Sequence, residues 1–145
     1  MRDLPRQLSA DQLAELFEGR TALVEKLAQR DDPLGSAHEV IAGLTEDEKL
    51  EALNSHPAIG AKNLSPRSAA EQGASGDPAV LTELAYLNQV YEEKFGFRFV
   101  VFVAGRPKVE ILEVLRERLE QDREEELETA LEELVAIARD RYQRS

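Results

Sequence analysis

A short segment near the middle of the chain gathers the residues best suited to acid-base chemistry. It contains His56, one of only two histidines, followed by Pro57 and then by Ser68, Glu71 and Gln72. Histidine changes its charge near neutral pH, so His56 is a candidate proton donor. The other three polar residues are spaced i, i+3 and i+4, which places them on one face if the segment is helical. The pattern predicts an acid-base group close to a polar, substrate-holding surface.

The same residues also have a purely structural interpretation. Pro57 disfavours helical geometry at His56, so the preceding helix should end there, where a histidine interacts favourably with the helix dipole. Ser65-Pro66 has the pattern of a new helix start, and Ser68 with Glu71 has the spacing of a capping box. The residues alone leave both interpretations open.

Arg141 provides a separate indication. It is in helical phase with an apolar stripe, whereas Arg139 and Arg144 point elsewhere, and we expect Arg139 to behave as an exposed charge. The stripe consists of Leu127, Leu131, Leu134 and Ala138. An inward guanidinium needs an anion, which could be a substrate carboxylate or Glu71, unless the side chain only snorkels to solvent from the helix end.

One segment differs from its helical surroundings. Residues 97–103 read FRFVVFV between Gly96 and Gly105, and this β-branched and aromatic content is typical of extended backbone. No other segment is an obvious partner strand. Buried backbone groups still need hydrogen-bond partners, and one solution is that the backbone of Phe99–Val103 faces a ligand.

The rest of the chain reads as helix, which predicts an all-α fold with a single multihelical domain over residues 1–145. Capping-box spacing occurs at Ser9, Ser36 and Thr45. The apolar pattern from Leu13 to Leu27 fits one helix that kinks at Gly19 or two short ones. Another helix is expected from Pro78, after the capping Asp77, to Gly96. Two more should close the chain, through Ile111–Leu119 and through Leu127–Ala138.

Composition narrows the classes of function. The formal charge is −11, with 29 acidic against 18 basic side chains, which disfavours a nucleic-acid partner. Cysteine is absent, which suits a reducing, cytoplasmic setting. We see no secretory leader, and the longest apolar run, Phe99–Ala104, is too short for a membrane span. The glutamate-rich stretch from Glu117 to Glu133 is expected to be a solvated helix face, and His38 a surface residue.

Four stretches carry a family resemblance. HPAIG, SAAEQ, LNQVYEEKFGFRFVVFVAG and ELETALEELVAIARDRY resemble, in order from about Leu8 to Tyr142, motifs of the 2-oxo-4-hydroxy-4-carboxy-5-ureidoimidazoline (OHCU) decarboxylases. That resemblance implies an all-helical, cofactor-free and commonly dimeric enzyme of urate breakdown. The implied reaction converts OHCU to (S)-allantoin. No metal is expected.

The resemblance also implies roles for individual residues. His56 would be the proton donor, with Pro57, Ser68–Gln72 and the backbone of Phe99, Val100, Val101, Phe102 and Val103 lining the substrate site. Glu71 would act in catalysis, and Glu71 and Gln72 can hold the hydroxyl and ureido groups. Ala58 stands where an acidic residue is usual, and the loop at 73–77 is reshaped, which leaves open a related ureido or imidazoline substrate.

Two alternatives come from other classes of protein. A non-catalytic helical interaction module would explain the capped helices and the acidic tail, but not the clustered His-Pro and S-x-x-E-Q residues. A carboxylate-bridged metal hydrolase in a helical bundle would need a glutamate three residues before a histidine. Leu53 precedes His56 by three and Gly35 precedes His38 by three, so neither histidine meets that spacing.

Overall fold

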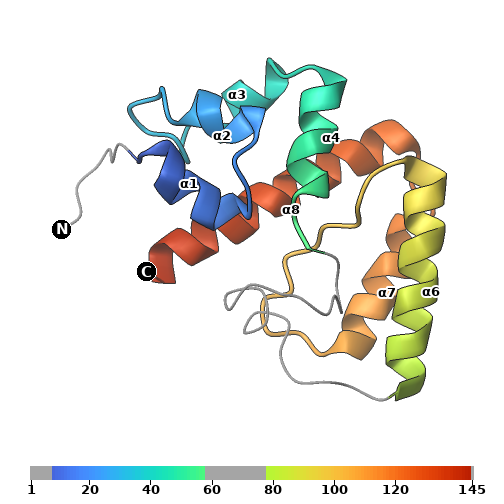
Figure 1. Ribbon diagram of the computed structural model, residues 1–145. Helices are drawn as coiled ribbons and strands as arrows, with labels where there is room; N and C mark the ends of the chain where they lie inside the picture. The colour runs from blue at the N-terminus through green and yellow to red at the C-terminus, as the bar shows by residue number, and fades with distance from the viewer. Residues whose placement is uncertain (1–7, 58–77, 145) are drawn as a thin grey trace. The chain divides into compact units, whose positions relative to one another are not determined.

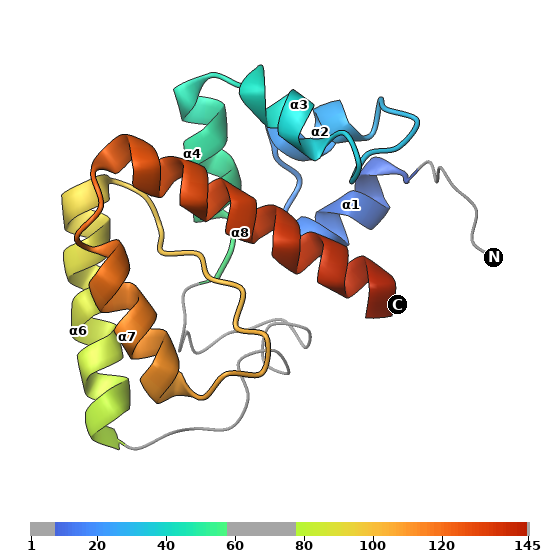
Figure 2. The same ribbon diagram turned by 180° about the vertical axis from the view of Figure 1, so that it is seen from behind.

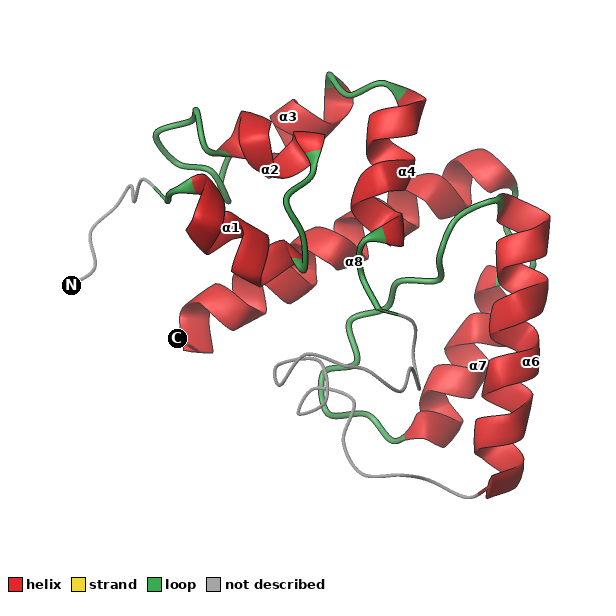
Figure 3. Cartoon of the chain, in the orientation of Figure 1, coloured by secondary structure: helices red, strands yellow, loops and turns green. Residues whose placement is uncertain are grey.

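The computed structural model describes residues 8–57 and 78–144, and the regular elements in these ranges are helices joined by turns and loops (Figures 1 and 3). Seven helices and no strand occur there, which confirms the all-α prediction. The chain divides into two compact units, residues 1–56 with 134–145, and residues 57–133. The single domain over 1–145 stays a prediction. No helix in the described ranges has the length and apolarity that a membrane crossing requires.

The first unit contains four short helices and the end of a long one. These are α1 (Ala10–Phe17), α2 (Ala22–Leu27), α3 (Ala37–Ala42), α4 (Glu46–Asn54) and the last part of α8 (Arg123–Arg144). The apolar pattern from Leu13 to Leu27 fitted either one kinked helix or two short ones. The structure has two helices there, α1 and α2. The break comes at Glu18, whose φ of 65° is left-handed, and Thr21 then caps α2. The buried core includes Leu13, Phe17, Leu23, Leu27, Leu53 and Ala138.

Two of the three predicted capping boxes form. Ser9 and Thr45 each accept a hydrogen bond from the amide three residues on, and the side chain there reaches back. The prediction at Ser36 is wrong, because its side chain makes no cap bond. Its backbone, at φ −95° and ψ 4°, is already in a turn closed onto the Asp32 carbonyl at 2.9 Å, and a capping residue needs extended backbone.

Because Thr45 forms a capping bond and Ser36 does not, replacing each by alanine should change the stability by different amounts. Thr45→Ala should lower the free energy of unfolding by about 1 kcal/mol, because an amide of the first turn loses its acceptor. Ser36→Ala removes no such bond and should cost much less. Urea unfolding of both variants, followed by circular dichroism, measures the difference, and equal losses at the two positions would contradict it.

The second unit is built on α6 (Pro78–Phe95), α7 (Lys108–Arg118) and the first part of α8. Helices α6 and α7 lie side by side (Figures 1 and 2). As predicted, α6 starts at Pro78 and ends before Gly96, whose φ of 82° suits glycine and turns the chain away from the helix. The helices predicted through Ile111 and Leu127 are α7 and α8.

The segment after Gly96, which was predicted to be extended, is neither helix nor strand in the described ranges. Its first part is fixed by aromatic packing. The rings of Tyr91, Phe95, Phe97 and Phe99 lie with centroids 4.7–5.9 Å apart. Phe97 and Phe99 are buried, so this packing anchors the start of the extended segment within the second unit.

Candidate active site

His56 lies where the sequence predicted, at the end of a helix. Helix α4 ends at Asn54, Ser55 is its C-cap, and the His56 amide donates to the Leu53 carbonyl at 3.2 Å. His56 is only 7% exposed, and Pro57 is half-buried. His56 is therefore largely shielded from bulk water. His38, in contrast, is exposed, as predicted.

The three polar residues that follow lie outside the described residues. These are Ser68, Glu71 and Gln72, together with the helix start expected at Ser65-Pro66. Their roles, and the capping alternative for Ser68 with Glu71, stay predictions.

Arg141 points into the protein, as its helical phase predicted. Its side chain is 0% exposed, and Nη1 donates to the Leu16 carbonyl and to Glu18 Oε2, both at 3.0 Å. The expectation for Arg139 was wrong. It is half-buried and donates to the Leu34 carbonyl at 2.9 Å, because a long side chain can reach a neighbour that helical phase does not reveal. Arg144 is the exposed arginine, paired with Asp140 at 2.9 Å.

The turn between α1 and α2 lies against the end of α4 that leads to His56. A β-carbon on Gly19 would stand 3.1 Å from the Ser55 β-carbon, closer than most such contacts, so this approach favours glycine. The Ala22 amide donates to Glu51 Oε1 of α4 at 2.9 Å. A possible break at Gly19 was predicted from the sequence, but its contacts with Ser55 and Glu51 were not.

The backbone of the extended segment is partly occupied. The Val100 carbonyl accepts from Arg118, and the Phe102 amide donates to Glu133 Oε1, both at 2.9 Å. Arg106 binds the carbonyls of Phe102 and Val103. Within the described part of the chain, the Val101 amide and carbonyl have no partner. This buried residue therefore keeps both backbone groups available for a ligand.

A buried polar cluster contacts the backbone and one aromatic ring of the extended segment. Glu126 is fully buried and accepts hydrogen bonds from Tyr91 Oη, from Arg118 Nε at 2.6 Å and from Gln121 Nε2 at 2.6 Å. The Arg118 guanidinium also lies 4.8 Å from the Phe99 ring centroid. Burial, together with the hydrogen bond to Glu126, raises the pKa of Tyr91, so the phenol stays a proton donor.

This cluster corrects the prediction that Glu117–Glu133 is a solvated face. Most glutamates of the stretch are exposed, but Glu126 is buried, and Glu133 binds the extended segment. Tyr91, the partner of Glu126, lies in the LNQVYEEKFGFRFVVFVAG stretch that carries the family resemblance. The pairing joins residues 35 positions apart, which local patterns do not reveal.

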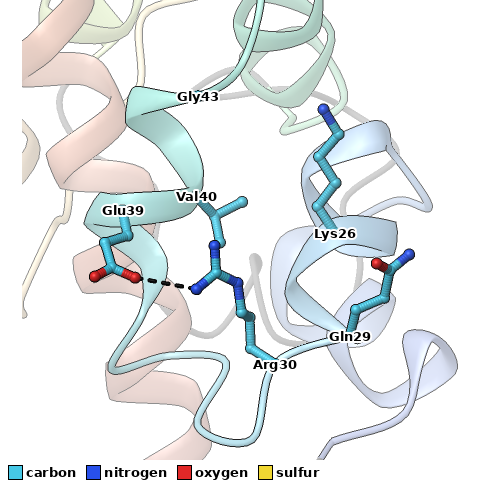
Figure 4. A pocket seen from close by; sticks show the side chains of 6 residues that line it. All are labelled: Lys26, Gln29, Arg30, Glu39, Val40 and Gly43. Atoms are coloured by element: carbon cyan, nitrogen blue, oxygen red, sulfur yellow. Dashed lines mark hydrogen bonds and ion pairs between the residues drawn. The ribbon is translucent and has the colours of Figure 1, made fainter.

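A surface pocket of about 390 Å³ lies in the first unit, between α2 and α3 (Figure 4). Its lining includes Lys26, Arg30 and Glu39 and none of the predicted site residues. Arg30 reaches toward Glu39, to which it is paired at 3.0 Å, and Lys26 pairs with Glu48 at 3.3 Å. Both cations are thus neutralised and partly exposed, which makes the pocket a weak candidate for catalysis. In the described ranges no group of three histidine or carboxylate side chains could hold a metal ion.

Comparison with known proteins decides the family. The OHCU decarboxylase family model matches residues 2–143. The chain belongs to the OHCU decarboxylase family. It is 30% identical to the uric acid degradation bifunctional protein PucL of Bacillus subtilis, over 96% of this chain and 30% of that protein. It is 28% identical to the OHCU decarboxylase of Haloferax volcanii, over 88% of this chain and 83% of that one.

A solved structure agrees with the family. The crystal structure of an OHCU decarboxylase in the presence of (S)-allantoin matches with a TM-score of 0.74 at 28% identity, over 88% of this chain and 92% of that one. This match confirms the all-helical fold that the resemblance implied. The chain spans only 30% of the length of the first curated relatives, the bifunctional uric acid degradation proteins.

Proposed function

We propose that this protein decarboxylates OHCU to (S)-allantoin and CO2 in urate degradation. The observation that carries the proposal is the similarity, over 88% of the chain, to an OHCU decarboxylase crystallised in the presence of (S)-allantoin. The family match over residues 2–143 supports it. The reaction belongs to the carboxy-lyases, which break a carbon–carbon bond to release CO2.

The chemistry needs few groups from the protein. The bond to the carboxylate breaks, its electron pair passes into the adjacent C=N system of the ring, and CO2 leaves. The heterocycle is its own electron sink, so no organic cofactor has to supply one. His56 then delivers a proton to one face of the carbanion, which yields one enantiomer. The shielding of His56 from water supports this role, since bulk water would protonate either face.

The remaining residues hold the substrate in this proposal. Glu71 and Gln72 bind its hydroxyl and ureido groups, and Glu71 assists catalysis by orienting the hydroxyl. Ser68 and Pro57 line the site. The backbone of Phe99–Val103 pairs with the carbonyl and N–H edges of the ring, which the unoccupied backbone groups of Val101 support.

We also propose that Arg141 binds an anion at the site, either the substrate carboxylate or Glu71, and Arg141→Ala tests this role. We expect kcat/KM to fall roughly 10- to 100-fold, because the transition state would lose the free energy of about one charge-assisted hydrogen bond. Arg141→Lys should recover part of the loss, because lysine keeps the charge without the planar fork. Arg144→Ala is the control, since this arginine is exposed and pairs across one helical turn with Asp140. Equal, small effects in steady-state kinetics at 141 and 144 would remove Arg141 from the site.

Ligand binding distinguishes this proposal from its rivals. (S)-Allantoin should raise the melting temperature more than (R)-allantoin, because only the native state with a complete site binds it. An interaction module would show no shift with either enantiomer. A shift with other ureido or imidazoline compounds but not with allantoin would favour a related decarboxylase, and stoichiometric metal in the purified protein would favour a hydrolase.

We also propose that the protein is a cytoplasmic homodimer, as the family resemblance implies. The absence of cysteine suits a reducing compartment. Tyr86 on α6 and Val109 on α7 are the large apolar side chains exposed in the described part of the chain, and a partner surface would cover such groups favourably. Light scattering on the purified protein measures the mass, and a monomer at micromolar concentration would contradict the dimer.

A further inference from the structure

We propose that Glu18 is a positioning residue for the reaction, acting through Arg141. In this inference, which rests on the proposed function, the Glu18 carboxylate fixes the Arg141 guanidinium. The turn that carries Glu18 also contacts the end of α4 that leads to His56. One short turn of the first unit would then set the positions of both groups.

The first observation is the ion pair itself. Glu18 Oε2 lies 3.0 Å from Arg141 Nη1, and the two side chains are 13% and 0% exposed. The same nitrogen donates to the Leu16 carbonyl at 3.0 Å. Leu16 is in the last turn of α1, so the cation also lies at the negative end of a helix dipole. A buried guanidinium held at two points has little freedom to rotate.

The second observation is backbone strain at Glu18. Its φ of 65° and ψ of 29° are left-handed, a conformation that costs free energy in any residue with a β-carbon. Glycine is the usual residue at this position after a helix, and here glycine comes one residue later, as Gly19. The chain therefore keeps a glutamate where glycine would relieve strain. Strain of this kind, next to a buried charge, indicates a functional requirement for the carboxylate.

The third observation links Glu18 to the end of α4. Gly19 packs so closely on Ser55 that a β-carbon there would approach the Ser55 β-carbon to 3.1 Å. The Ala22 amide is bonded to Glu51 Oε1 at 2.9 Å. His56 follows Ser55 directly. A displacement of the turn would therefore shift the backbone that carries His56 as well as the Arg141 guanidinium.

Glu18→Gln is the first test, because it keeps the shape of the side chain and removes its charge. We expect kcat/KM on OHCU to fall roughly 10- to 100-fold, because small misplacements of reacting groups reduce rates by such factors. Glu25→Gln is the matched control. Glu25 is also in the first unit and pairs with Arg20 at 2.7 Å, but its side chain is 52% exposed, and activity should stay unchanged.

A double-mutant cycle separates positioning from a general loss of stability. If Glu18 acts through Arg141, Glu18→Gln should change kcat/KM little in an Arg141→Ala background. If the loss of kcat/KM in the double variant instead equals the product of the two single losses, the residues act independently and the inference is overturned. A second readout needs no substrate: the NMR signal of the Arg141 Nε–H group, identified by its loss in Arg141→Ala, should shift and broaden in Glu18→Gln but not in Glu25→Gln. An unchanged signal would also overturn the inference.

Glu18→Gly keeps the test informative if the glutamine variant folds poorly. Glycine relieves the left-handed backbone and lacks the carboxylate, so this variant should melt at a higher temperature than Glu18→Gln and still show the loss of activity. Near wild-type activity in Glu18→Gly would overturn the inference. An inactive wild type would overturn the proposed function and this inference with it, whereas an active wild type with unaffected Glu18 variants would overturn only the inference.

Discussion

Replacing His56 by asparagine should reduce decarboxylation of OHCU by roughly 10²- to 10⁴-fold, the usual contribution of a general acid. Asparagine cannot deliver the proton, and any remaining product should form with weaker stereochemical preference. The fold should survive. His56 follows the last residue of α4 and its C-cap, and asparagine is well tolerated just beyond a helix end.

The chain offers a matched control for this substitution. His38, the other histidine, is exposed on α3, so His38→Asn should leave both rate and melting temperature unchanged. The measurements are the rate of (S)-allantoin formation, followed by circular dichroism, and a thermal melt of each variant. If His56→Asn works within about twofold of the wild-type rate, well short of a general acid's contribution, another group donates the proton.

Replacing Glu126 by alanine should lower the free energy of unfolding by roughly 3–5 kcal/mol, the usual cost of leaving a buried charge uncompensated. Glu126 is the carboxylate that neutralises buried Arg118, and it also accepts from Tyr91 and Gln121. A small domain is typically stable by about 5–15 kcal/mol, so this loss would remove a large share of the total.

Three further variants make this prediction specific to the cluster. Glu128→Ala alters an exposed glutamate of the same helix and should cost little. Tyr91→Phe removes one donor to Glu126 and should cost about 1 kcal/mol. The double variant Arg118→Met with Glu126→Leu removes both charges together and should recover much of the loss, because no charge is left buried. Urea denaturation measures all four, and equal costs at 126 and 128 would show that Glu126 is not an essential counter-ion.

The parts of the fold that were predicted correctly depend on local signals. Pro78 and Gly96 bound α6 because proline and glycine restrict the backbone wherever they occur. Thr45 caps α4 through a bond to an amide three residues away. Ser36 shows the limit of such signals, since the same spacing gives no cap when the preceding turn has already fixed the backbone.

The parts that were missed depend on contacts between distant residues. Arg141 was placed inward correctly by helical phase, but its partner Glu18 lies more than a hundred positions away in the sequence. Arg139 binds a carbonyl 105 positions away, and Glu126 pairs with a tyrosine 35 positions away. Local composition made Glu126 look like its solvated neighbours, because burial is decided by tertiary packing rather than by the surrounding charges.

Turnover of OHCU by the purified protein is the decisive measurement for the proposed decarboxylase activity. Freshly generated OHCU decays slowly on its own, so circular dichroism must compare the reaction with and without protein. We expect an optical signal of (S)-allantoin that appears at a rate proportional to protein concentration and exceeds spontaneous decay. Decay at the spontaneous rate, with no excess of either enantiomer at any protein concentration, would contradict the proposed activity.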